Sequence, residues 1–524
     1  MILRKVWGSM WNRSNSCKDM VTPTSTSRVP PLPPLTMLSS SSSLGAFDQL
    51  PMDILVQILM LIQPRDAVML SLTCKAWRCL ASGNRLWMFY LQSSQQSWDS
   101  IFFAETSLRY GYPLRLVSSQ SGELSFMRIY GQRAQVPGSV IIDGGSGYCK
   151  FGWSKFDSPS GRSATFLEFG NIESPIYARL QQFFATIFTR MHVKSSMQPI
   201  VVSLPLCHFD DTESAKASRR QLKTAILNVL FDMNVPAVCA VNQASLSFTL
   251  YHKQIMKYSV LCSQAVLALY AAGRTSGIVV NIGFQVITVL PILNGKVMRQ
   301  VGVEVIGFGA LKLTGFLREK MQENNVSFQS LYTVRTLKEH VLFEVTDYSS
   351  LFSIASCNTF LFVMRMQKLC YVALDYKAEL SRDTQASVEV SGEGWFTLSK
   401  ERFQTGEILF QPRLAGMRAM SLHQAVALCM DHCDAAGLAG DDSWFKTVVL
   451  TGGSACLPGL AERLERELHD HLSPSISNGV RVLPPPCGVD TAWHGAKLIS
   501  NLSTFPGPWC ITRKQFRRKS RLMW

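Results

Sequence analysis

Three times along the chain, a buried-strand pattern runs directly into a glycine-containing turn. The first strand, at 140–142, precedes D-G-G-S-G-Y-C-K at 143–150. The others, at 277–282 and 447–450, end in N-I-G-F-Q and T-G-G-S. Glycine lets backbone amides approach an anion, while a serine and a lysine add a donor and a positive charge. One such turn is weak evidence, but three within about 370 residues predict a two-lobed α/β domain with a nucleotide-type cleft.

The composition is that of a globular protein whose excess charge lies at its two ends. Of 524 residues, 47% are apolar and 17% charged, and the formal net charge is +15. Residues 1–46 carry five basic side chains against one acid, and residues 513–521 carry six more. The body between them is therefore only mildly basic. No internal repeat of fixed period is visible.

The 14 cysteines show no paired spacing, which predicts a reducing compartment without disulfides. Cys429 and Cys433 lie near histidines, but this spacing without a second pair does not predict a metal site. The most apolar stretch, Leu351 to Met364, is shorter than the ~20 residues of a membrane span. We therefore expect a soluble protein with no metal.

The segment from Val21 to Gly45 contains eleven Ser/Thr and five Pro residues, a composition typical of disorder. It predicts a disordered basic tail over residues 1–46. A transit peptide is the alternative, since the segment is Ser-rich and acid-poor, although Pro30 to Pro34 would interrupt its helix.

The first folded unit begins at Leu50-Pro51, where a proline suits a first helical turn and Asp53 complements the helix dipole. A short apolar helical face follows, Pro64 ends it, and two further short helices are expected before residue 91. The pattern L-P, D-I-L-x-x-I-L, D-A-x-x-L-x-x-x-C-K-x-W-R and L-W resembles the F-box family over residues 47–91. The resemblance implies docking on the Skp adaptor subunit of cullin-type ubiquitin ligases. The implied adaptor contacts or core residues are Leu50, Pro51, Ile54, Leu55, Ile58 and Leu59, whereas Cys74 and Trp77 are expected in the core.

Residues 92–136 are mixed and predict a linker with a short helix at 123–132. From residue 137 to residue 512 the chain resembles actin. The resemblance rests on the first turn and on A-L-Y-A-A-G-R-T-S-G-I-V-V at 268–280, K-L-C-Y-V-A-L-D-Y at 368–376, E-R-F-x-x-x-E-I-L-F-Q-P at 401–412, T-G-G-S-A-C-L-P-G-L-A-E-R at 451–463 and P-P-x-x-x-x-x-A-W-x-G-A-K-L-x-S-N-L-S-T-F at 485–505. The chain thus resembles the F-box-containing actin-related proteins of plants, which implies a small all-α bundle before an α/β two-lobed domain of the actin, Hsp70 and sugar-kinase type. The implied nucleotide-binding residues are Asp143, Gly145, Ser146, Gly147, Lys150, Gly283, Lys338, Glu339, Gly452 and Gly453.

The second turn departs from the family, which has D-x-G-D-G there and a histidine three residues later. Here the corresponding residues are Asn281, Gly283, Phe284, Gln285 and Thr288. Losing these carboxylates removes most of the charge that holds Mg²⁺, and Phe284 stands where backbone must approach a phosphate. Val489 also replaces an expected adenine-side lysine. The sequence predicts no ATPase activity, and leaves open a weakened binding of ATP or ADP with Mg²⁺.

A small subdomain that mediates filament contacts in the family is deleted after residue 171, so we do not expect actin-like filaments. Segments 245–265 and 340–367 interrupt actin-like strings and are interpreted as retained introns or splice inserts. Genuine surface loops are the alternative.

The sequence predicts a non-catalytic F-box adaptor or scaffold that links an unknown target protein to a Skp–cullin ligase. The alternatives are a nuclear actin-related subunit of a chromatin or nucleolar assembly and, with less support, an active ATPase. The basic tail at 513–524 predicts a location in the nucleus, with the nucleolus as a candidate compartment, and in the cytoplasm. Neither membrane binding nor direct nucleic-acid binding is expected.

Overall fold

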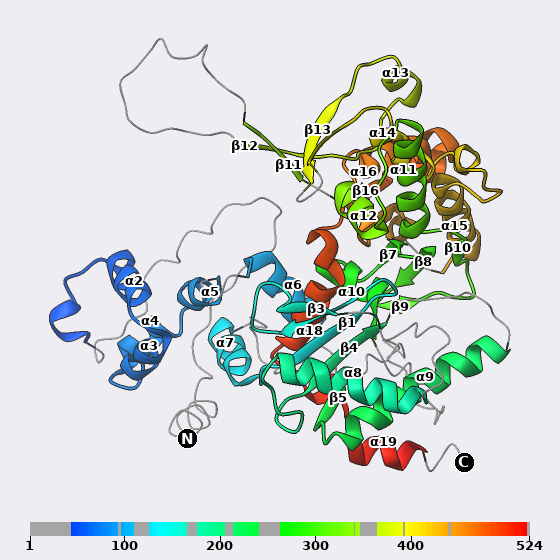
Figure 1. Ribbon diagram of the computed structural model, residues 1–524. Helices are drawn as coiled ribbons and strands as arrows, with labels where there is room; N and C mark the ends of the chain where they lie inside the picture. Colours follow the sequence, from blue (N-terminus) through cyan, green and yellow to red (C-terminus); the bar gives the residue numbers. More distant parts are fainter. Residues whose placement is uncertain are drawn as a thin grey trace, which may run out of the picture. The chain divides into compact units, whose positions relative to one another are not determined.

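The computed structural model (Figure 1) describes residues 43–92, 96–108, 125–163, 165, 175–204, 213–239, 262–339, 341–345, 364–390, 394–438 and 442–520. The chain divides into two compact units. The helical unit comprises residues 1–137 and 498–509, and the two-sheet unit comprises residues 138–497 and 510–524. Among the described helices, none has the length and apolar character needed to cross a membrane.

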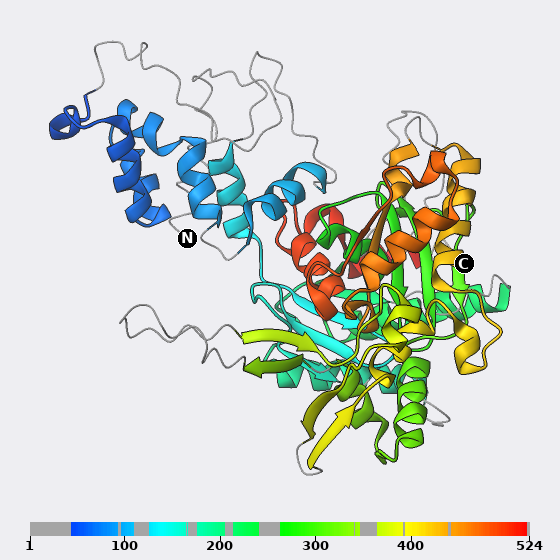
Figure 2. The same cartoon turned by 90° about the horizontal axis from the view of Figure 1, so that it is seen from above.

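The helical unit is built from short helices that lie side by side in Figure 2. Pro51 precedes the first long helix, and the Cys74 sulfur accepts the Trp77 amide at the start of another. The unit's core includes Leu55, Leu59, Trp87 and Tyr90. The helices are η1 (Gly45–Phe47), α2 (Met52–Leu61), α3 (Pro64–Leu70), α4 (Lys75–Ala81), α5 (Asn84–Gln92), α6 (Trp98–Ser107) and α7 (Phe126–Gln135).

The predicted linker at 92–136 contains two of these helices, α6 and α7. The Asn84 side chain accepts the Phe126 amide at 3.0 Å, which ties α7 to α5. Glu105 on α6 is buried and pairs with Arg133 on α7 at 3.0 Å. Glu105 also accepts the backbone N–H of Ser503 at 3.0 Å and the Ser503 hydroxyl. Segment 498–509 is therefore part of the helical unit, although it is far from α6 in sequence.

In the two-sheet unit, the described strands form two main sheets. The first lobe contains the sheet β17-β5-β4-β1-β2-β3, with β6 paired to β4, and helices α8 (Ile176–Arg190) and α9 (Glu213–Asp232). Its strands are β1 (Val140–Gly144), β2 (Cys149–Trp153), β3 (Gly161–Ser163), β4 (Ile200–Leu204), β5 (Ala237–Cys239), β6 (Cys262–Ser263) and β17 (Cys510–Thr512).

The second lobe contains the sheet β10-β8-β7-β15-β16, with β9 paired to β8. Its strands are β7 (Gly277–Ile282), β8 (Ile287–Leu293), β9 (Lys296–Val297), β10 (Glu304–Ile306), β15 (Thr447–Thr451) and β16 (Arg481–Leu483). In each lobe an antiparallel hairpin, β1–β2 or β7–β8, is followed by parallel pairing of its first strand, with β4 or β15. The lobes therefore share one connectivity, a structural repeat that the sequence does not reveal.

The remaining described elements belong mostly to the second lobe. They are α10 (Gln264–Ala271), α11 (Ala310–Glu323), α12 (Leu331–Glu339), β11 (Val341–Val345), β12 (Met364–Lys368), α13 (Tyr376–Leu380), β13 (Ala386–Val390), β14 (Gly394–Leu398), α14 (Glu401–Glu407), η2 (Pro412–Ala415), α15 (Leu422–Ala436), η3 (Asp442–Lys446), η4 (Ser454–Cys456), α16 (Leu460–His471), α17 (Pro474–Ser477), η5 (Gly488–Asp490), α18 (Thr491–Ser500), η6 (Gly507–Trp509) and α19 (Arg513–Ser520).

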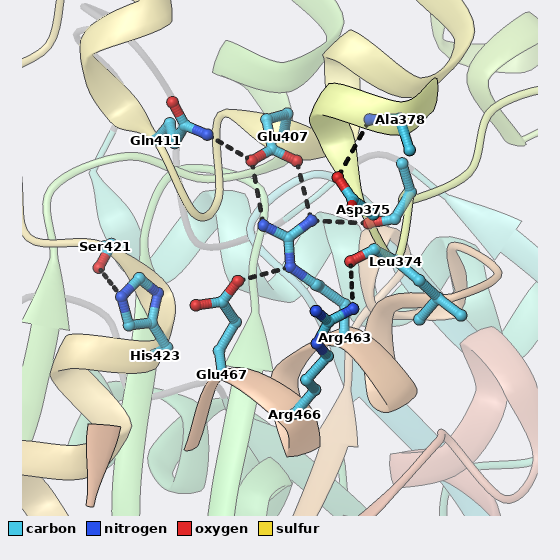
Figure 3. A network of polar contacts seen from close by, with 11 residues as sticks. Leu374, Asp375, Ala378, Glu407, Gln411, Ser421, His423, Arg463, Arg466 and Glu467 are labelled. Atoms are coloured by element: carbon cyan, nitrogen blue, oxygen red, sulfur yellow. Dashed lines mark hydrogen bonds and ion pairs between the residues drawn. The ribbon is translucent and has the colours of Figure 1, made fainter. Parts of the chain in front are cut away.

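A buried ion-pair network joins α14 to α16 (Figure 3). The Arg463 guanidinium donates to Glu407 at 3.3 Å and to Glu467 at 2.6 Å, and Gln411 donates to Glu407 at 2.9 Å. Burial raises the pKa of Glu407, and the charge of Arg463 opposes that rise. The network stabilises the second lobe only while both partners are present, because either charge alone would be buried without compensation.

The structure places the edges of three segments that the sequence analysis defined in regular elements. Gln264 and Ala265, assigned to the first insert, are the first residues of the buried helix α10. The second insert begins and ends in the β11–β12 hairpin, in which Val341 pairs with Lys368; its middle lies outside the described residues. The tail at 513–524 begins as helix α19, which is anchored by the Phe516 ring against Phe231.

Candidate functional site

The three glycine turns converge in the two-sheet unit. Gly452 on the third turn has a φ of +104°, and its Cα faces the Ile282 carbonyl so closely that no side chain would fit. A Cβ atom added to Gly147 on the first turn would lie 3.1 Å from the Phe284 ring on the second. Glycines 147 and 452 are therefore required by close packing between the turns, as well as by turn geometry.

Asp143 ends β1 and is buried. Its Oδ1 accepts the Ser203 hydroxyl and the Gln264 amide at 2.6 Å, and Gln264 also donates to the Gly144 carbonyl at 3.2 Å. Gln264 is a site residue that the sequence analysis missed. The available signal was a repeated Q-A pair, at 243–244 and 264–265, of which the second joins the site.

Lys150, predicted to neutralise a phosphate, lies in the same hairpin but has partners within the chain. Its ammonium forms an ion pair with Asp490 at 3.0 Å and donates to the Val489 carbonyl. The Val489 position, where the family places a lysine, thus supplies a backbone acceptor for Lys150. Ser146 lies half-buried on the turn, and the Gly145 amide closes the turn by donating to the Tyr148 carbonyl at 3.2 Å.

The second turn is closed by the Gly283 amide, which donates to the Val286 carbonyl at 3.1 Å. The first amides of α11, those of Ala310 and Leu311, donate to the carbonyls of Gly283 and Phe284 at 2.9 and 2.8 Å. A helix N-terminus is a common anion site, but these two donors are already used by the turn. Thr288, at the family's histidine position, is buried on β8 with no partner for its hydroxyl among the described residues.

Lys338 and Glu339 were expected to face a purine from one helix. Instead, the Lys338 amine is buried and donates to the Ala310 carbonyl at 3.2 Å and to the Thr314 and Ser454 hydroxyls at 3.0 Å. Burial lowers its pKa to about 8. Lys338 is therefore an internal cation that joins α12 to α11 and η4. Glu339 lies beside Gly453 and pairs with Arg335 at 3.3 Å.

These residues do not fit a magnesium nucleotide between the turns. The Phe284 ring lies against Gly147, the first amides of α11 are occupied, and Lys150 and Lys338 point to partners within the protein. The neutral Asn281 and Phe284 stand where the family has two carboxylates. Of the acidic residues that hold the metal in the family, this chain keeps Asp143. We therefore derive no chemical step through a nucleotide.

The other candidate site is the outer face of α2. Leu55 and Leu59 are 1% and 0% exposed and belong to the core, whereas Leu50 and Ile54 are 38% and 40% exposed. Ile58 is half-buried and Pro51 exposed. Leu61, seven residues beyond Ile54 and 86% exposed, is not among the adaptor contacts that the sequence analysis named. We call Ile54, Ile58 and Leu61 on α2, together with Leu50 just before the helix, the α2 stripe.

The predicted core role of Trp77 is confirmed, and Cys74 is half-buried as a helix cap. More exposed apolar side chains lie in the same bundle, namely Phe47, Met69, Leu72 and Phe89. An isolated exposed apolar residue is ordinary, but several in one small bundle indicate an interaction surface.

Comparison with known proteins decides the family. The actin family model matches residues 135–520, which is most of the chain, and an F-box-like model matches residues 47–93. The chain belongs to the actin family. It is an actin-related protein of the plant type, with an α/β actin domain behind a helical F-box-like domain, and the resemblances described for the sequence are confirmed.

Its relatives include proteins named "Actin-related protein 8". The one from Arabidopsis thaliana is 80% identical over 524 residues, which is 100% of both chains. Those from Oryza sativa subsp. indica and subsp. japonica are 55% identical over 523 residues, covering 99% of this chain and 98% of theirs.

Proposed function

We propose that this actin-related protein is a non-catalytic adaptor whose F-box-like bundle docks on a Skp-type subunit of a cullin ubiquitin ligase. The observation that carries the proposal is the α2 stripe, in which Leu50, Ile54 and Leu61 are exposed and Ile58 is half-buried, while Leu55 and Leu59 of α2 form the core. Ile54, Ile58 and Leu61 lie at i, i+4 and i+7 of the helix, and such an apolar helix face suits a partner's apolar groove.

The stripe is large enough to support binding. Fully burying a Leu or Ile side chain is favourable by ~1.5–3 kcal/mol, and a few such anchors dominate most interfaces. The actin-like body would then present an unidentified target protein to the ligase or act as a scaffold. No ATPase activity is needed for that role, and actin-like filaments are not expected from a body without the family's small subdomain.

The alternative is a nuclear actin-related subunit of a chromatin or nucleolar assembly. It is favoured by α19, on which Lys514 and Arg518 are exposed. For either role we propose that the protein is located in the nucleus, with the nucleolus as a candidate compartment, and in the cytoplasm. A full-length fluorescent fusion that is excluded from nuclei would reject the nuclear part.

The test is binding of the full-length protein to a purified Skp-type adaptor. The double variant Leu50→Asp, Ile54→Asp places two charges on the stripe and should abolish the complex. Phe102→Asp is the matched control, because Phe102 is exposed on α6 of the same unit, outside the stripe. Unchanged adaptor binding by the folded double variant would reject the proposal. Affinity purification from plant cells separates the alternatives, since it should recover either cullin or chromatin subunits.

A further inference from the structure

We propose that Phe284 and Tyr148 replace the nucleotide as the link between the two lobes, so that the actin-like body stays closed without any ligand. The proposal goes beyond the adaptor function, because it concerns how the body keeps its shape. It rests on contacts between the first turn, in the first lobe, and residues of the second lobe.

The first contact is that of Phe284 with Gly147. The Phe284 Cγ and Cδ2 atoms would lie 3.1 Å from a Cβ atom at Gly147, so the ring rests on the glycine's backbone. The turn that carries Phe284 is fixed by its own hydrogen bond and by the two amides of α11. Phe284 is half-buried in this position. Moving the ring out to admit a phosphate would expose apolar surface and leave the carbonyls of the turn to find new donors.

The second contact is that of Tyr148 with Arg335. The Arg335 guanidinium on α12 lies 4.6 Å from the centre of the Tyr148 ring, within the range of a cation–π interaction. Arg162 on β3 lies 5.3 Å from the same ring. Arg335 is held by Glu339, one turn further along α12. Tyr148 therefore binds a cation of the second lobe, and the first turn contacts that lobe at two points.

The charged groups around these contacts are paired within the protein. Lys150 pairs with Asp490, Asp143 accepts from Ser203 and Gln264, and Lys338 donates to oxygen atoms of α11 and η4. A nucleotide would have to break these interactions and would gain no carboxylate pair for its metal. A ligand shifts an equilibrium between two states only if it binds one of them more tightly. We therefore expect that MgATP does not stabilise the closed form of the body.

The test is hydrogen exchange of the full-length protein at the first turn, residues 144–149, with and without MgATP. The wild-type turn should exchange at the same rate with MgATP, with EDTA and with buffer alone. In the variant Phe284→Ala, exchange at this turn should rise about tenfold, because the apolar contact is lost. Tyr148→Leu should give a smaller rise at the same turn.

Phe396→Ala is the matched control. Phe396 packs on Phe328 at 4.8 Å within the second lobe, away from the first turn. This variant should leave exchange at residues 144–149 unchanged. Slower exchange of the wild-type turn in MgATP, or unchanged exchange in Phe284→Ala, would overturn the proposal. Adaptor binding by Phe284→Ala is measured separately and should equal that of the wild type, so failure of this proposal and failure of the adaptor function can be told apart.

Discussion

The F-box-like bundle and the glycine turns between the lobes keep their family patterns to different degrees, and their side chains are used differently. In the bundle the apolar pattern is complete; Ile54 and Leu61 are exposed on α2, and Leu50 is exposed just before it. At the turns, Phe284 and Asn281 replace acids, and the nearby Lys150 and Lys338 are paired inside the protein. A surface can recognise a partner only through groups that folding leaves available. The bundle has such groups, whereas most of the charged groups at the turns already have partners within the chain.

The largest expected effect is a loss of stability in the actin-like body that leaves adaptor binding by the bundle unchanged. Arg463→Met leaves the buried Glu407 without its cation and should lower the free energy of unfolding by ~3–5 kcal/mol. Chemical denaturation of the full-length protein measures this loss. Arg466→Met is the control, since Arg466 is exposed and its contact with the Leu374 carbonyl is long, at 3.4 Å. Adaptor binding by Arg463→Met at low temperature should remain; if it disappears while the fold persists, the two regions are not independent.

Neighbouring residues of α2 should behave in opposite ways. Leu55→Ala creates a cavity in the bundle core and should cost ~2–5 kcal/mol of stability. Ile54→Ala, one residue away but exposed, should leave stability within about 0.5 kcal/mol and weaken adaptor binding about tenfold. Unfolding curves and adaptor titrations of both variants make the comparison. Equal losses of stability would show that the stripe is part of the core.

A smaller effect is expected at the buried carboxylate that holds segment 498–509. Glu105→Gln removes the charge that pairs with Arg133 and weakens the acceptor of Ser503, so the helical unit should lose about 2 kcal/mol. Ser503→Ala removes one donor and should cost about half as much. Native-state hydrogen exchange of α6 and of residues 498–509 measures the change. If α6 keeps its protection in both variants, the segment does not stabilise the unit.

The smallest effect is a pH dependence from Lys338. Burial lowers the folded-state pKa of Lys338 to about 8 from its ordinary value of 10.5, so the folded protein releases this proton at a lower pH than the unfolded chain does. The contribution of Lys338 to the free energy of unfolding should therefore rise above pH 8, by about 1 kcal/mol at pH 9 relative to pH 7. Buried thiols act in the opposite direction: burial raises the pKa of Cys370 to about 12, so over this range it ionises only in the unfolded chain. Lys338→Met keeps the thiols and lacks the amine, so the difference in unfolding free energy between the wild type and this variant, from chemical denaturation at pH 7 and pH 9, should change by about 1 kcal/mol in favour of the wild type. An unchanged difference would contradict the buried position of Lys338.

Much of the architecture could be predicted because local patterns specify it. Pro51, Asp53 and the apolar spacing predict α2, and the three strand-to-turn patterns predict β1, β7 and β15. These patterns mark where the strands end, but they do not predict the shared connectivity of the two lobes, because strand pairing joins residues that are far apart in sequence.

The candidate site was predicted less well, for physical reasons that differ between residues. Gln264 was missed because only folding brings it beside Asp143, 121 residues away. Lys338 was assigned to a nucleotide site from its place in a family motif. The motif places the residue on a helix, but it does not show that the amine points into the protein. The substitution at Phe284 was visible in the sequence, but its contact with Gly147 depends on how the lobes pack.

We propose that this protein recognises partners through its bundle and does not bind nucleotides at the turns between its lobes. Calorimetric titration of one preparation of the full-length protein, first with a Skp-type adaptor and then with MgATP, tests it most directly. We predict saturable heat with the adaptor, which should be absent in the double variant Leu50→Asp, Ile54→Asp, and only the heat of dilution with MgATP. Saturable binding of MgATP, or no binding of the adaptor by the folded wild-type protein, would contradict it.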